Sequence, residues 1–506
     1  MNKSLNLLGA MALASFAACT APTYQQPEAP IQEVPFTQVQ INDQFWTPRI
    51  ETNRTVSIPS AFYQCEINGR FDTFAIAGGL MKGEHKGDFS FDDTDPYKII
   101  EGASYSLAVK YDEKLDHYLD SVINIIAAAQ EPDGYLTTCV TNKCYRLSGW
   151  WGRSRWEKMN SHELYNMGHM YEGAVAYFRA TGKRKWLDVA EKNARHINKV
   201  FFEGDPAYND GKPVMEAPGH EELELALVKL YQTTGEQLYL DMAKKFIDIR
   251  GQGRNPEIYY SQQHMPVREQ REAVGHSVRA LYLYSGMADI VANTGDTTLN
   301  PALDAIWHDI ADKKIHINGG LGSVPGIEGF GPAYMLPNKD TYDETCAAVA
   351  NVFFNYRMFL APGDAKFVDM AEISLYNNVL AGVNLEGNKF FYVNVLETDS
   401  KRGFNHGNAG RSPWFDCACC PSNIARLIPQ GPGLIYSQTD NDIFCGLYAG
   451  SNVEIDLADT KVKLDQKTGY PFDGNIDIQV DPEKEGAEFT LWVRIPTWTS
   501  DRFIPG

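Results

Sequence analysis

The chain has 506 residues, a net charge of −19, and a composition that is 43% hydrophobic and 12% aromatic. That length supports two or three domains around a large core, and the composition is typical of a globular protein rather than a disordered one. The strong negative charge argues against nucleic acid or an anionic membrane surface as a partner.

The first residues have the pattern of an export signal. Met-Asn-Lys is followed by an apolar run over residues 5–16 and then by Ala-Ala-Cys19, which resembles a bacterial lipoprotein signal. We therefore expect a signal peptide over residues 1–18, a lipid anchor at Cys19, and a Pro- and Gln-rich flexible tether over residues 19–35. The expected location is the bacterial periplasm or cell surface, and a plain secretory signal cut near Cys19 is the alternative.

The middle of the chain repeats a helical pattern. Thr-Gly recurs at Gly182, Gly235 and Gly295, and Pro-Gly follows at Gly363, so that these glycines are 53, 60 and 68 residues apart. Each glycine separates an apolar helical segment from an amphipathic one, and glycine just after the last periodic residue is a helix-stop signal. The repeat therefore predicts a series of helical hairpins.

The spacing of the hairpins predicts a mainly α fold, an (α/α)6 barrel over residues 36–436, with an open solenoid as the alternative. Residues 423–429 are expected to close the outer ring. The inner helices are expected near residues 54, 97, 162, 220, 276 and 345.

Beyond the barrel the apolar residues alternate with period two. This alternation predicts half-buried strands of a β-sandwich domain over residues 437–506, which looks incomplete at its C-terminal end. The expected strands cover residues 453–457, 461–464, 476–480 and 489–495.

Three histidines share the period of the helical repeat. His162, His220 and His276 open successive inner helices, 58 and 56 residues apart. In a toroid the inner helices start at one rim, so we expect these histidines at a shared cavity; for each one, a hydrogen-bonded structural role is the alternative. Trp156, with Trp150 and Trp151, precedes His162 and is either a sugar-stacking platform or ordinary packing.

The helix that begins near His162 carries a polar stripe. His162, Tyr165, His169 and Glu172 fall on one helical face. Burying such groups without partners costs about 1–3 kcal/mol each, so the stripe is expected to line water or a ligand.

Two short cysteine segments lie about seventy residues apart. Glu344-Thr-Cys346 opens an inner helix, and Cys417-Ala-Cys419-Cys420-Pro421 is expected to be a turn whose proline blocks a helix. Three thiolates and a carboxylate are a plausible zinc set, and by themselves favour a structural zinc site over a catalytic one. Cys139 and Cys144 are close enough in sequence to be considered as a disulfide pair.

A glycine-rich loop precedes the first cysteine segment. Glu328 lies in this loop, sixteen residues before Glu344. A carboxylate beside a metal site is a candidate general acid/base, and a solvated loop glutamate is the alternative.

Together these segments resemble glycoside hydrolase family 127, the β-L-arabinofuranosidase family. The resemblance covers roughly residues 36 to 500, and the double-cysteine segment is its most specific mark. The motifs that carry it are Ser161-His-Glu-Leu-Tyr165, Gly168-His169, Pro218-Gly-His220, Glu272-Ala-Val-Gly-His276, Glu344-Thr-Cys346, Phe390-Phe-Tyr392-Val-Asn394 and Cys419-Cys-Pro-Ser-Asn423.

The resemblance implies an (α/α)6 catalytic domain followed by β-sandwich domains. It also implies that Zn²⁺ is bound at the positions of Glu344, Cys346, Cys419 and Cys420, with Cys419 as nucleophile and Glu328 as general acid/base. The positions of Glu372 and Tyr392, like those of the three rim histidines, are then expected near the sugar.

The expected function is that of an exo-acting, retaining glycosidase that removes terminal β-L-arabinofuranose, or a close furanose-like sugar, from the oligosaccharides of plant glycans. Two alternatives remain. A sugar epimerase or unsaturated-uronide hydrolase would use the same barrel without the zinc set. A zinc-stabilised glycan-binding lipoprotein would bind sugar without turning it over.

Overall fold

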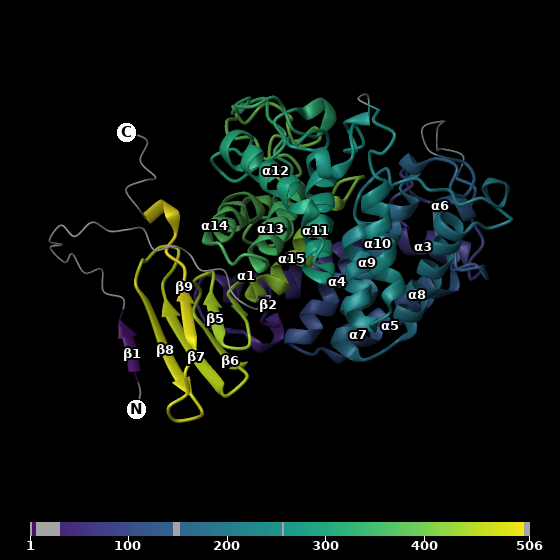
Figure 1. The fold of residues 1–506 in the computed structure, drawn as a ribbon. Coiled ribbons are helices and arrows are strands. Elements are labelled where there is room, and N and C mark those ends of the chain that lie inside the picture. The colour runs from purple at the N-terminus through teal and green to yellow at the C-terminus, as the bar shows by residue number, and fades with distance from the viewer. Residues whose placement is uncertain (1–2, 7–30, 145–151, 256–257, 500–506) are drawn as a thin grey trace. The chain divides into compact units, whose positions relative to one another are not determined.

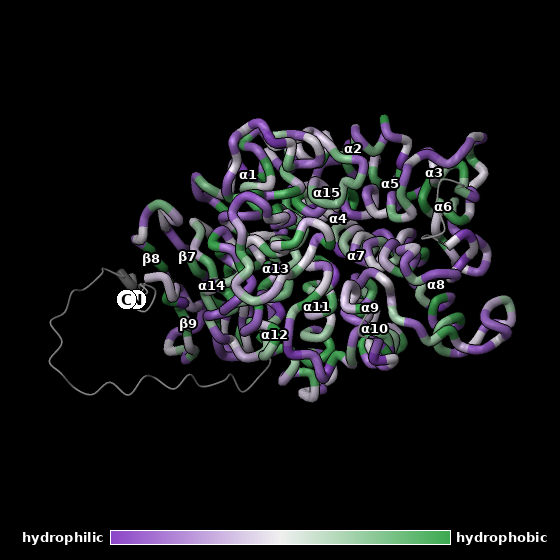
Figure 2. Tube along the Cα trace, turned by 90° about the horizontal axis from the view of Figure 1, so that it is seen from above, coloured by the Kyte–Doolittle hydropathy of each residue, from purple (hydrophilic) through white to green (hydrophobic). Residues whose placement is uncertain are grey.

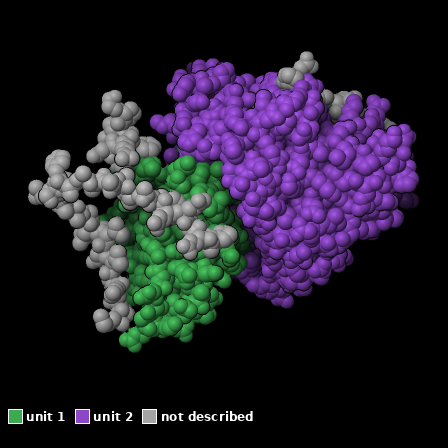
Figure 3. Space-filling model, in the orientation of Figure 1, with its two compact units in different colours: residues 1–52, 355–372, 428–506 green, residues 53–354, 373–427 purple. Residues whose placement is uncertain are grey.

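The computed structural model describes residues 3–6, 31–144, 152–255 and 258–499 of the chain. The chain divides into two compact units (Figure 3). Unit 1 comprises residues 1–52, 355–372 and 428–506, and unit 2 comprises residues 53–354 and 373–427. Unit 2 is helical and unit 1 contains the two β-sheets, so the prediction of a mainly helical protein with a C-terminal β domain is confirmed.

Unit 2 is built from helical hairpins (Figure 1). Figure 2 shows the first helix of each hairpin towards the middle and the second helix outside it. Neighbouring first helices pack against one another, α4 on α7, α7 on α9 and α9 on α11. The hairpins are α4 (Thr94–Val109) with α5 (Glu113–Ala128), α7 (Glu163–Thr181) with α8 (Lys185–Asn198), α9 (Leu223–Thr234) with α10 (Gln237–Ile249), and α11 (Ser277–Thr294) with α12 (Asn300–Lys313).

The burial pattern explains why the first helices are central. Every residue of α7 from Glu163 to Tyr177 is buried, whereas α8 and α10 each bury only one face. A helix that is buried all round must be enclosed by other elements, and an amphipathic helix covers them. Two further helices follow along the chain: α13 (Thr345–Leu360) begins in unit 2, and α14 (Ala365–Ile373) lies almost entirely in unit 1. Shorter helices of unit 2 are α3 (Arg70–Ala77) and α6 (Thr138–Thr141).

The glycine stop signals act as predicted. Gly182, Gly235 and Gly295 follow α7, α9 and α11 with φ of 72°, 73° and 70°. In this left-handed conformation each glycine N–H donates to a carbonyl of the last helical turn, at 2.7, 2.7 and 2.9 Å. A side chain at these positions would strain the backbone, so glycine ends the helix with least cost.

The prediction of an inner helix near residue 54 is wrong. Residues near 54 lie between α1 (Trp46–Thr52) and α2 (Ile58–Ile67), and the inner position is taken instead by α15 (Cys419–Leu427), which packs on α4. The proline was expected to prevent a helix here. Pro421 is, however, the third residue of α15, within the first turn, where a backbone N–H has no intrahelical acceptor to lose.

Unit 1 carries two sheets, as expected of a sandwich. One has the strand order β1-β8-β7-β6-β3 and the other β2-β4-β5-β9. The β6 pattern alternates buried and exposed residues along its whole length, which confirms the period-two prediction. The strands are β1 (Lys3–Asn6), β2 (Gln32–Glu33), β3 (Gln40–Ile41), β4 (Tyr436–Gln438), β5 (Asp442–Cys445), β6 (Ser451–Asp456), β7 (Lys461–Thr468), β8 (Ile476–Pro482) and β9 (Thr490–Val493).

The end of the expected tether is part of a sheet. β2 pairs with β4, and Val34 is fully buried, so residues 31–35 are held by packing and backbone hydrogen bonds rather than free. Cys19 and most of the expected signal segment lie outside the described residues, although β1 pairs with β8. Among the helices that the structure describes, none is both long enough and apolar enough to cross a membrane.

Candidate active site

A cavity of about 580 Å³ lies at the amino ends of six helices of unit 2. About half of the residues that line it lie at the starts of these helices or just before them, and the rest lie in loops. Helix amino ends carry partial positive charge, so this end of the barrel favours anionic groups such as thiolates. The residues at the helix starts are Thr94 and Asp95 at α4, His162 and Tyr165 at α7, His220 before α9, His276, Val278 and Arg279 at α11, Glu344 and Cys346 at α13, and Cys419 and Asn423 at α15.

Three of these side chains, Glu344, Cys346 and Cys419, converge with Cys420 as the sequence predicted. The ligand atoms of Glu344, Cys346, Cys419 and Cys420 all lie within 4.8 Å of one another. Cys419 Sγ is 3.5 Å from Glu344 Oε1 and 3.9 Å from Cys420 Sγ, and Cys420 Sγ is 3.1 Å from Cys346 Sγ. Two segments far apart in sequence therefore form one cluster.

The cluster fits a zinc ion. Tetrahedral Zn²⁺, with bonds of about 2.3 Å to sulfur and about 2.0 Å to oxygen, sets S···S near 3.8 Å and S···O near 3.5 Å. Glu344 Oε2 is buried without a hydrogen-bond partner, and no lysine or arginine in the described part of the chain forms an ion pair with this carboxylate. Burial and the neighbouring Cys419 charge raise the pKa of Glu344 well above its usual range. A divalent cation bound by these four groups would offset their negative charge.

The three thiols differ in their access to the cavity. Cys346 and Cys419 both line the cavity, but Cys346 is only 1% exposed whereas Cys419 is half-buried; Cys420 is 0% exposed and does not line it. Burial opposes ionisation of Cys346, but hydrogen bonds from the Cys419 and Cys420 thiols outweigh it and lower the pKa of Cys346. The set thus contains two buried thiols and one that a ligand can reach.

Glu344 is fixed by an extended segment that crosses the start of α13. Glu344 forms a backbone bridge with Val393, and Thr345 N donates to Tyr392 O at 3.0 Å. The Tyr392 hydroxyl in turn lies 3.1 Å from Cys419 Sγ. The predicted residue Tyr392 therefore lines the cavity and contacts the accessible thiol directly.

Glu328 stands beside this cluster. Its loop holds it in the left-handed region, with φ of 50°, and its side chain is 36% exposed. His276 Nε2 lies 3.2 Å from one carboxylate oxygen of Glu328 and the Tyr342 hydroxyl donates to the other at 2.8 Å. Burial opposes ionisation, but these hydrogen bonds and the His276 charge lower the pKa of Glu328. Its carboxylate also lies within 4.8 Å of Glu344 and His276.

The three rim histidines gather at the cavity as their spacing predicted. The ring centroids of His162 and His220 are 5.5 Å apart, and those of His220 and His276 are 5.6 Å apart. Burial, followed by the charge of Arg279, lowers the pKa of His162 and His220 well below the usual range. These imidazoles are neutral, and they offer the cavity uncharged hydrogen-bonding groups.

Two predicted substrate-binding residues lie elsewhere. Glu372 belongs to unit 1, where Arg494 donates to it at 2.6 Å and Tyr470 at 2.6 Å, and it is not among the residues described as lining the cavity. Trp156 is 7% exposed, with its ring packed against Tyr135. The carboxylate of Glu372 is thus paired with Arg494, and the ring of Trp156 is packed against another aromatic side chain. Trp150 and Trp151 lie outside the described residues.

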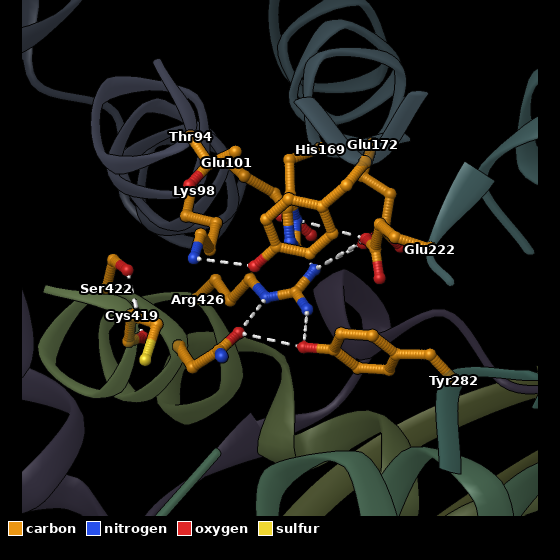
Figure 4. Close-up of polar contacts among 12 residues, drawn as sticks. Thr94, Lys98, Glu101, His169, Glu172, Glu222, Tyr282, Cys419, Ser422 and Arg426 are labelled. Carbon is orange, nitrogen blue, oxygen red and sulfur yellow. Dashed lines mark hydrogen bonds and ion pairs between the residues drawn. The ribbon is translucent and has the colours of Figure 1, made fainter. Parts of the chain in front are cut away.

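The lower part of the polar stripe faces other charges rather than water. Tyr165 lines the cavity, but His169 and Glu172, one and two turns further along α7, are sealed in a buried network around Arg426 of α15 (Figure 4). Arg426 donates to Glu172 and, at 3.1 Å, to Glu101, and His169 Nδ1 lies 3.0 Å from Glu222 Oε1. The expectation of a ligand along the whole stripe is therefore corrected: in its lower half Glu172 pairs with Arg426, and His169 is buried beside Glu222.

Sequence reasoning missed several residues of the site. Tyr342 donates to Glu328 and lies two residues before Glu344, so its closeness in sequence to a recognised residue was the available signal. The others carry no sequence pattern that separates them from core residues. They include Phe89, Phe91, Tyr260, His406, Trp414 and Phe415. Cys139 and Cys144, considered as a pair, are both free thiols.

Comparisons with known proteins agree with this geometry. Residues 38–433 match the family described as β-L-arabinofuranosidase, GH127 catalytic domain, and residues 442–504 match its middle domain. The chain belongs to the GH127 family of glycoside hydrolases.

Named relatives of this GH127 chain include a non-reducing end β-L-arabinofuranosidase of Bifidobacterium longum. It is 35% identical over 456 residues, which cover 84% of this chain and 67% of that protein. A solved GH127 β-arabinofuranosidase is 47% identical with a TM-score of 0.86, over 93% of this chain and 72% of its own. A GH127 β-L-arabinofuranosidase of Geobacillus stearothermophilus T6 is 40% identical with a TM-score of 0.84, over 91% and 75%.

Proposed function

We propose that this GH127 chain is an exo-acting, retaining glycosidase that releases terminal β-L-arabinofuranose, or a close furanose-like sugar, from plant glycans. The activity named for its relatives supports the sugar class. The cavity supports the reaction, since it gathers a reachable thiol, a carboxylate and neutral hydrogen-bonding rings in one space.

One observation carries the assignment of the nucleophile. Cys419 is the half-buried thiol of the four-residue cluster and lines the cavity, while Cys346 lines it with only 1% exposure and Cys420 is 0% exposed. A nucleophile must reach the anomeric carbon, so the two buried thiols are suited to hold a metal and Cys419 to attack. When bound by Glu344 and the three cysteines, zinc would keep the Cys419 thiol ionised and stabilise it as a leaving thiolate.

The first step displaces the leaving group. Cys419 Sγ attacks the anomeric carbon, and a C–S bond forms as the glycosidic C–O bond breaks. Glu328 enters this step in its protonated form and gives that proton to the departing oxygen, so the leaving chain is released as an alcohol. A thiolate here replaces one of the two carboxylates that retaining glycosidases normally use.

The second step restores the enzyme. Glu328, now ionised, takes a proton from water, and the water oxygen attacks the anomeric carbon as the C–S bond breaks. Two inversions give net retention. The hydrogen bonds from His276 and Tyr342 favour the ionised form of Glu328 and suit it to this second role.

The test uses a panel of nitrophenyl furanosides, including the β-L-arabinofuranoside, with and without a zinc chelator. The intact protein should release nitrophenol from that substrate, with retention seen by NMR, and the chelator should abolish release. Cys419→Ser and Glu328→Gln should lose more than about a thousandfold in kcat. Cys445→Ser, which changes a buried cysteine of unit 1, is the matched control.

Four results would contradict the proposal. Cys419→Ser with intact zinc and full turnover would exclude the cysteine nucleophile. Conversion of a free sugar without hydrolysis of any furanoside would favour an epimerase, and release of an unsaturated uronide would favour a uronide hydrolase. Binding without turnover, with unfolding on zinc removal, would favour a glycan-binding lipoprotein.

We also propose that the protein is exported as a lipoprotein anchored at Cys19. The support is the apolar run over residues 5–16 followed by Ala-Ala-Cys. Expressed in its bacterial host, the protein should take up labelled palmitate and sediment with membranes, and Cys19→Ala should abolish both. Labelling of the Cys19→Ala variant would contradict the anchor.

A further inference from the structure

Asn423 shares one helix face with the proposed nucleophile. It lies four residues after Cys419 on α15, and side chains four apart on an α-helix stand one above the other. Both residues line the cavity, although Asn423 is only 1% exposed. Any group that Asn423 presents to the cavity is therefore presented beside the reacting sulfur.

The hydrogen bonds of Asn423 fix which end of its amide faces inward. Arg426 Nε donates to Asn423 Oδ1 at 2.8 Å, and a guanidinium only donates, so the atom it contacts must be the amide oxygen. The Tyr282 hydroxyl lies 3.3 Å from the same oxygen and accepts from Arg426 Nη2 at 3.0 Å, which leaves its own hydrogen to donate to Asn423. Two donors thus hold the oxygen on the barrel side.

The amide nitrogen is left at the other end. Within the described chain Asn423 Nδ2 has no hydrogen bond, and it is not among the polar atoms that are sealed away without partners. An amide anchored by its oxygen presents two N–H donors in a fixed direction. A bound sugar offers hydroxyl oxygens as acceptors for them.

The anchor itself is rigid and well supported. Arg426 is fully buried and also pairs with Glu101 of α4 and Glu172 of α7 (Figure 4). Lys229 contributes a second cation to Glu172. Partners on three other helices therefore hold α15, and with it both Cys419 and Asn423.

We propose that Asn423 is a substrate-binding residue whose Nδ2 donates a hydrogen bond to an oxygen of the sugar held against Cys419, and that Arg426 is the positioning residue that orients this amide. The inference rests on the proposed glycosidase function and names a contact within it. A site built to pair with a substrate hydroxyl discriminates strongly against an analogue that lacks it, because the buried polar group is then left without a partner.

Asn423→Asp is the first test because it changes chemistry at nearly constant shape. The new carboxylate still accepts from Arg426 and Tyr282 but has no N–H, so kcat/KM should fall about 10- to 100-fold while the melting temperature and zinc content are kept. Asn423→Ala removes the donor without adding charge and should show a loss of the same order. Values within twofold of the wild type in both variants would overturn the inference.

Deoxy substrates identify the bonded oxygen. Nitrophenyl β-L-arabinofuranosides that lack one hydroxyl at a time are compared in the wild type and in Asn423→Ala. One of them should lose about tenfold or more in the wild type and nothing further in the variant, since the partner is already gone. Equal losses for every deoxy substrate in the two proteins would overturn the inference.

Arg426→Lys tests positioning separately from folding. Lysine keeps a cation for Glu101 and Glu172 but cannot hold the Asn423 oxygen in the same fork, so kcat/KM should lie between those of the wild type and Asn423→Ala. Adding Arg426→Lys to Asn423→Ala should cost little more, whereas a merely structural role would give additive losses with reduced zinc content. A wild type that neither cleaves nor binds any furanoside would remove the proposed function as well; unimpaired Asn423 variants of an active enzyme remove this inference alone.

Discussion

Each unit of the molecule contains a buried arginine held by carboxylates. In unit 2, Arg426 pairs with Glu101 and Glu172. In unit 1, Arg494 pairs with Asp369 and Glu372 at 2.5 and 2.6 Å. Both arginines also contact a buried tyrosine ring and a backbone or amide oxygen, so their local chemistry is similar.

The two clusters differ in what else their members touch. Arg426 holds Asn423, which lines the cavity and shares a helix with Cys419. Within the described chain, no residue that bonds to Arg494 lines that cavity. The comparison teaches that a buried carboxylate–arginine cluster is evidence of function only when one of its bonds reaches a site, and otherwise it supports packing.

Replacing each arginine should give the largest difference between the cluster that reaches the site and the cluster that only supports packing. Arg426→Met should lower the free energy of unfolding by about 3–5 kcal/mol, because it leaves buried carboxylates without their cation. It should also reduce kcat/KM of the folded enzyme by more than about a hundredfold, since α15 and Asn423 lose their anchor. Arg494→Met should cost comparable stability and little activity. Denaturant unfolding measures the stability of each variant, and kinetics are measured under conditions where both variants remain folded. Equal losses of activity in the two variants would contradict the distinction between the two clusters.

The two glutamates next to Arg426 should respond in opposite ways. Burial opposes ionisation of Glu172, but Lys229 and Arg426 lower its pKa well below the usual range. Burial and the Glu172 charge raise the pKa of Glu222 well above it. Glu172→Gln should therefore lower the free energy of unfolding by about 2–4 kcal/mol, whereas Glu222→Gln substitutes a neutral side chain for one already neutral and should cost little.

The raised pKa of Glu222 predicts the direction in which folding stability changes with pH. Above the ordinary glutamate pKa of about 4.3 the unfolded chain releases the Glu222 proton while the folded chain keeps it, so Glu222 lowers stability as pH rises, by up to about 1.4 kcal/mol per pH unit. Glu222→Gln should flatten this slope between about pH 5 and 8, as measured by urea unfolding. A steeper slope in the variant would contradict the assignment of the proton to Glu222.

Glu372 is the sharpest case in unit 1, because the family resemblance placed it near the sugar. It accepts from Arg494, Tyr470 and Trp498. Glu372→Gln should reduce the free energy of unfolding by about 1–3 kcal/mol, since one oxygen acceptor is replaced by a donor. Turnover on the furanoside panel should stay within twofold; a loss beyond tenfold at unchanged stability would return Glu372 to the active site.

The smallest contrast is between two buried tyrosine hydroxyls. Tyr470→Phe removes a donor to Glu372, and Tyr282→Phe removes one to Asn423. Each should cost about 1 kcal/mol of stability. Only Tyr282→Phe should also lower kcat/KM, by about three- to tenfold, because it loosens the amide that faces the cavity. The same kinetics in both variants would remove the distinction between the clusters.

Periodicity predicted what depends on local sequence. The helix-stop glycines, the rim histidines at matching repeat positions and the pairing of Glu344-Cys346 with Cys419-Cys420 all follow from spacing, motif or family resemblance. The helix at Cys419 was missed because proline was taken to end a helix, although the first turn tolerates it.

The remaining errors concern partners that sequence spacing does not show. Glu372 and Arg494 are 122 residues apart, and nothing local to either one indicates their ion pair. His169 and Glu172 had the right helical face but sit too deep along α7 to meet the cavity. Depth along an inner helix decides whether a polar group meets solvent or another charge, and it depends on where all the helices begin.

The position of the Arg426 network also limits the routes by which sugars can enter and leave the cavity. The cavity is lined partly by the first turns of the inner helices, and the space beyond them is filled by the paired side chains of Glu101, Glu172 and Arg426. Among the described residues, this network therefore closes the cavity on the side of Arg426, so sugars enter and leave on the opposite side. A released monosaccharide must leave through the opening that the next chain end enters, so accumulating free sugar should slow the enzyme competitively, and turnover should depend on how fast that opening is vacated.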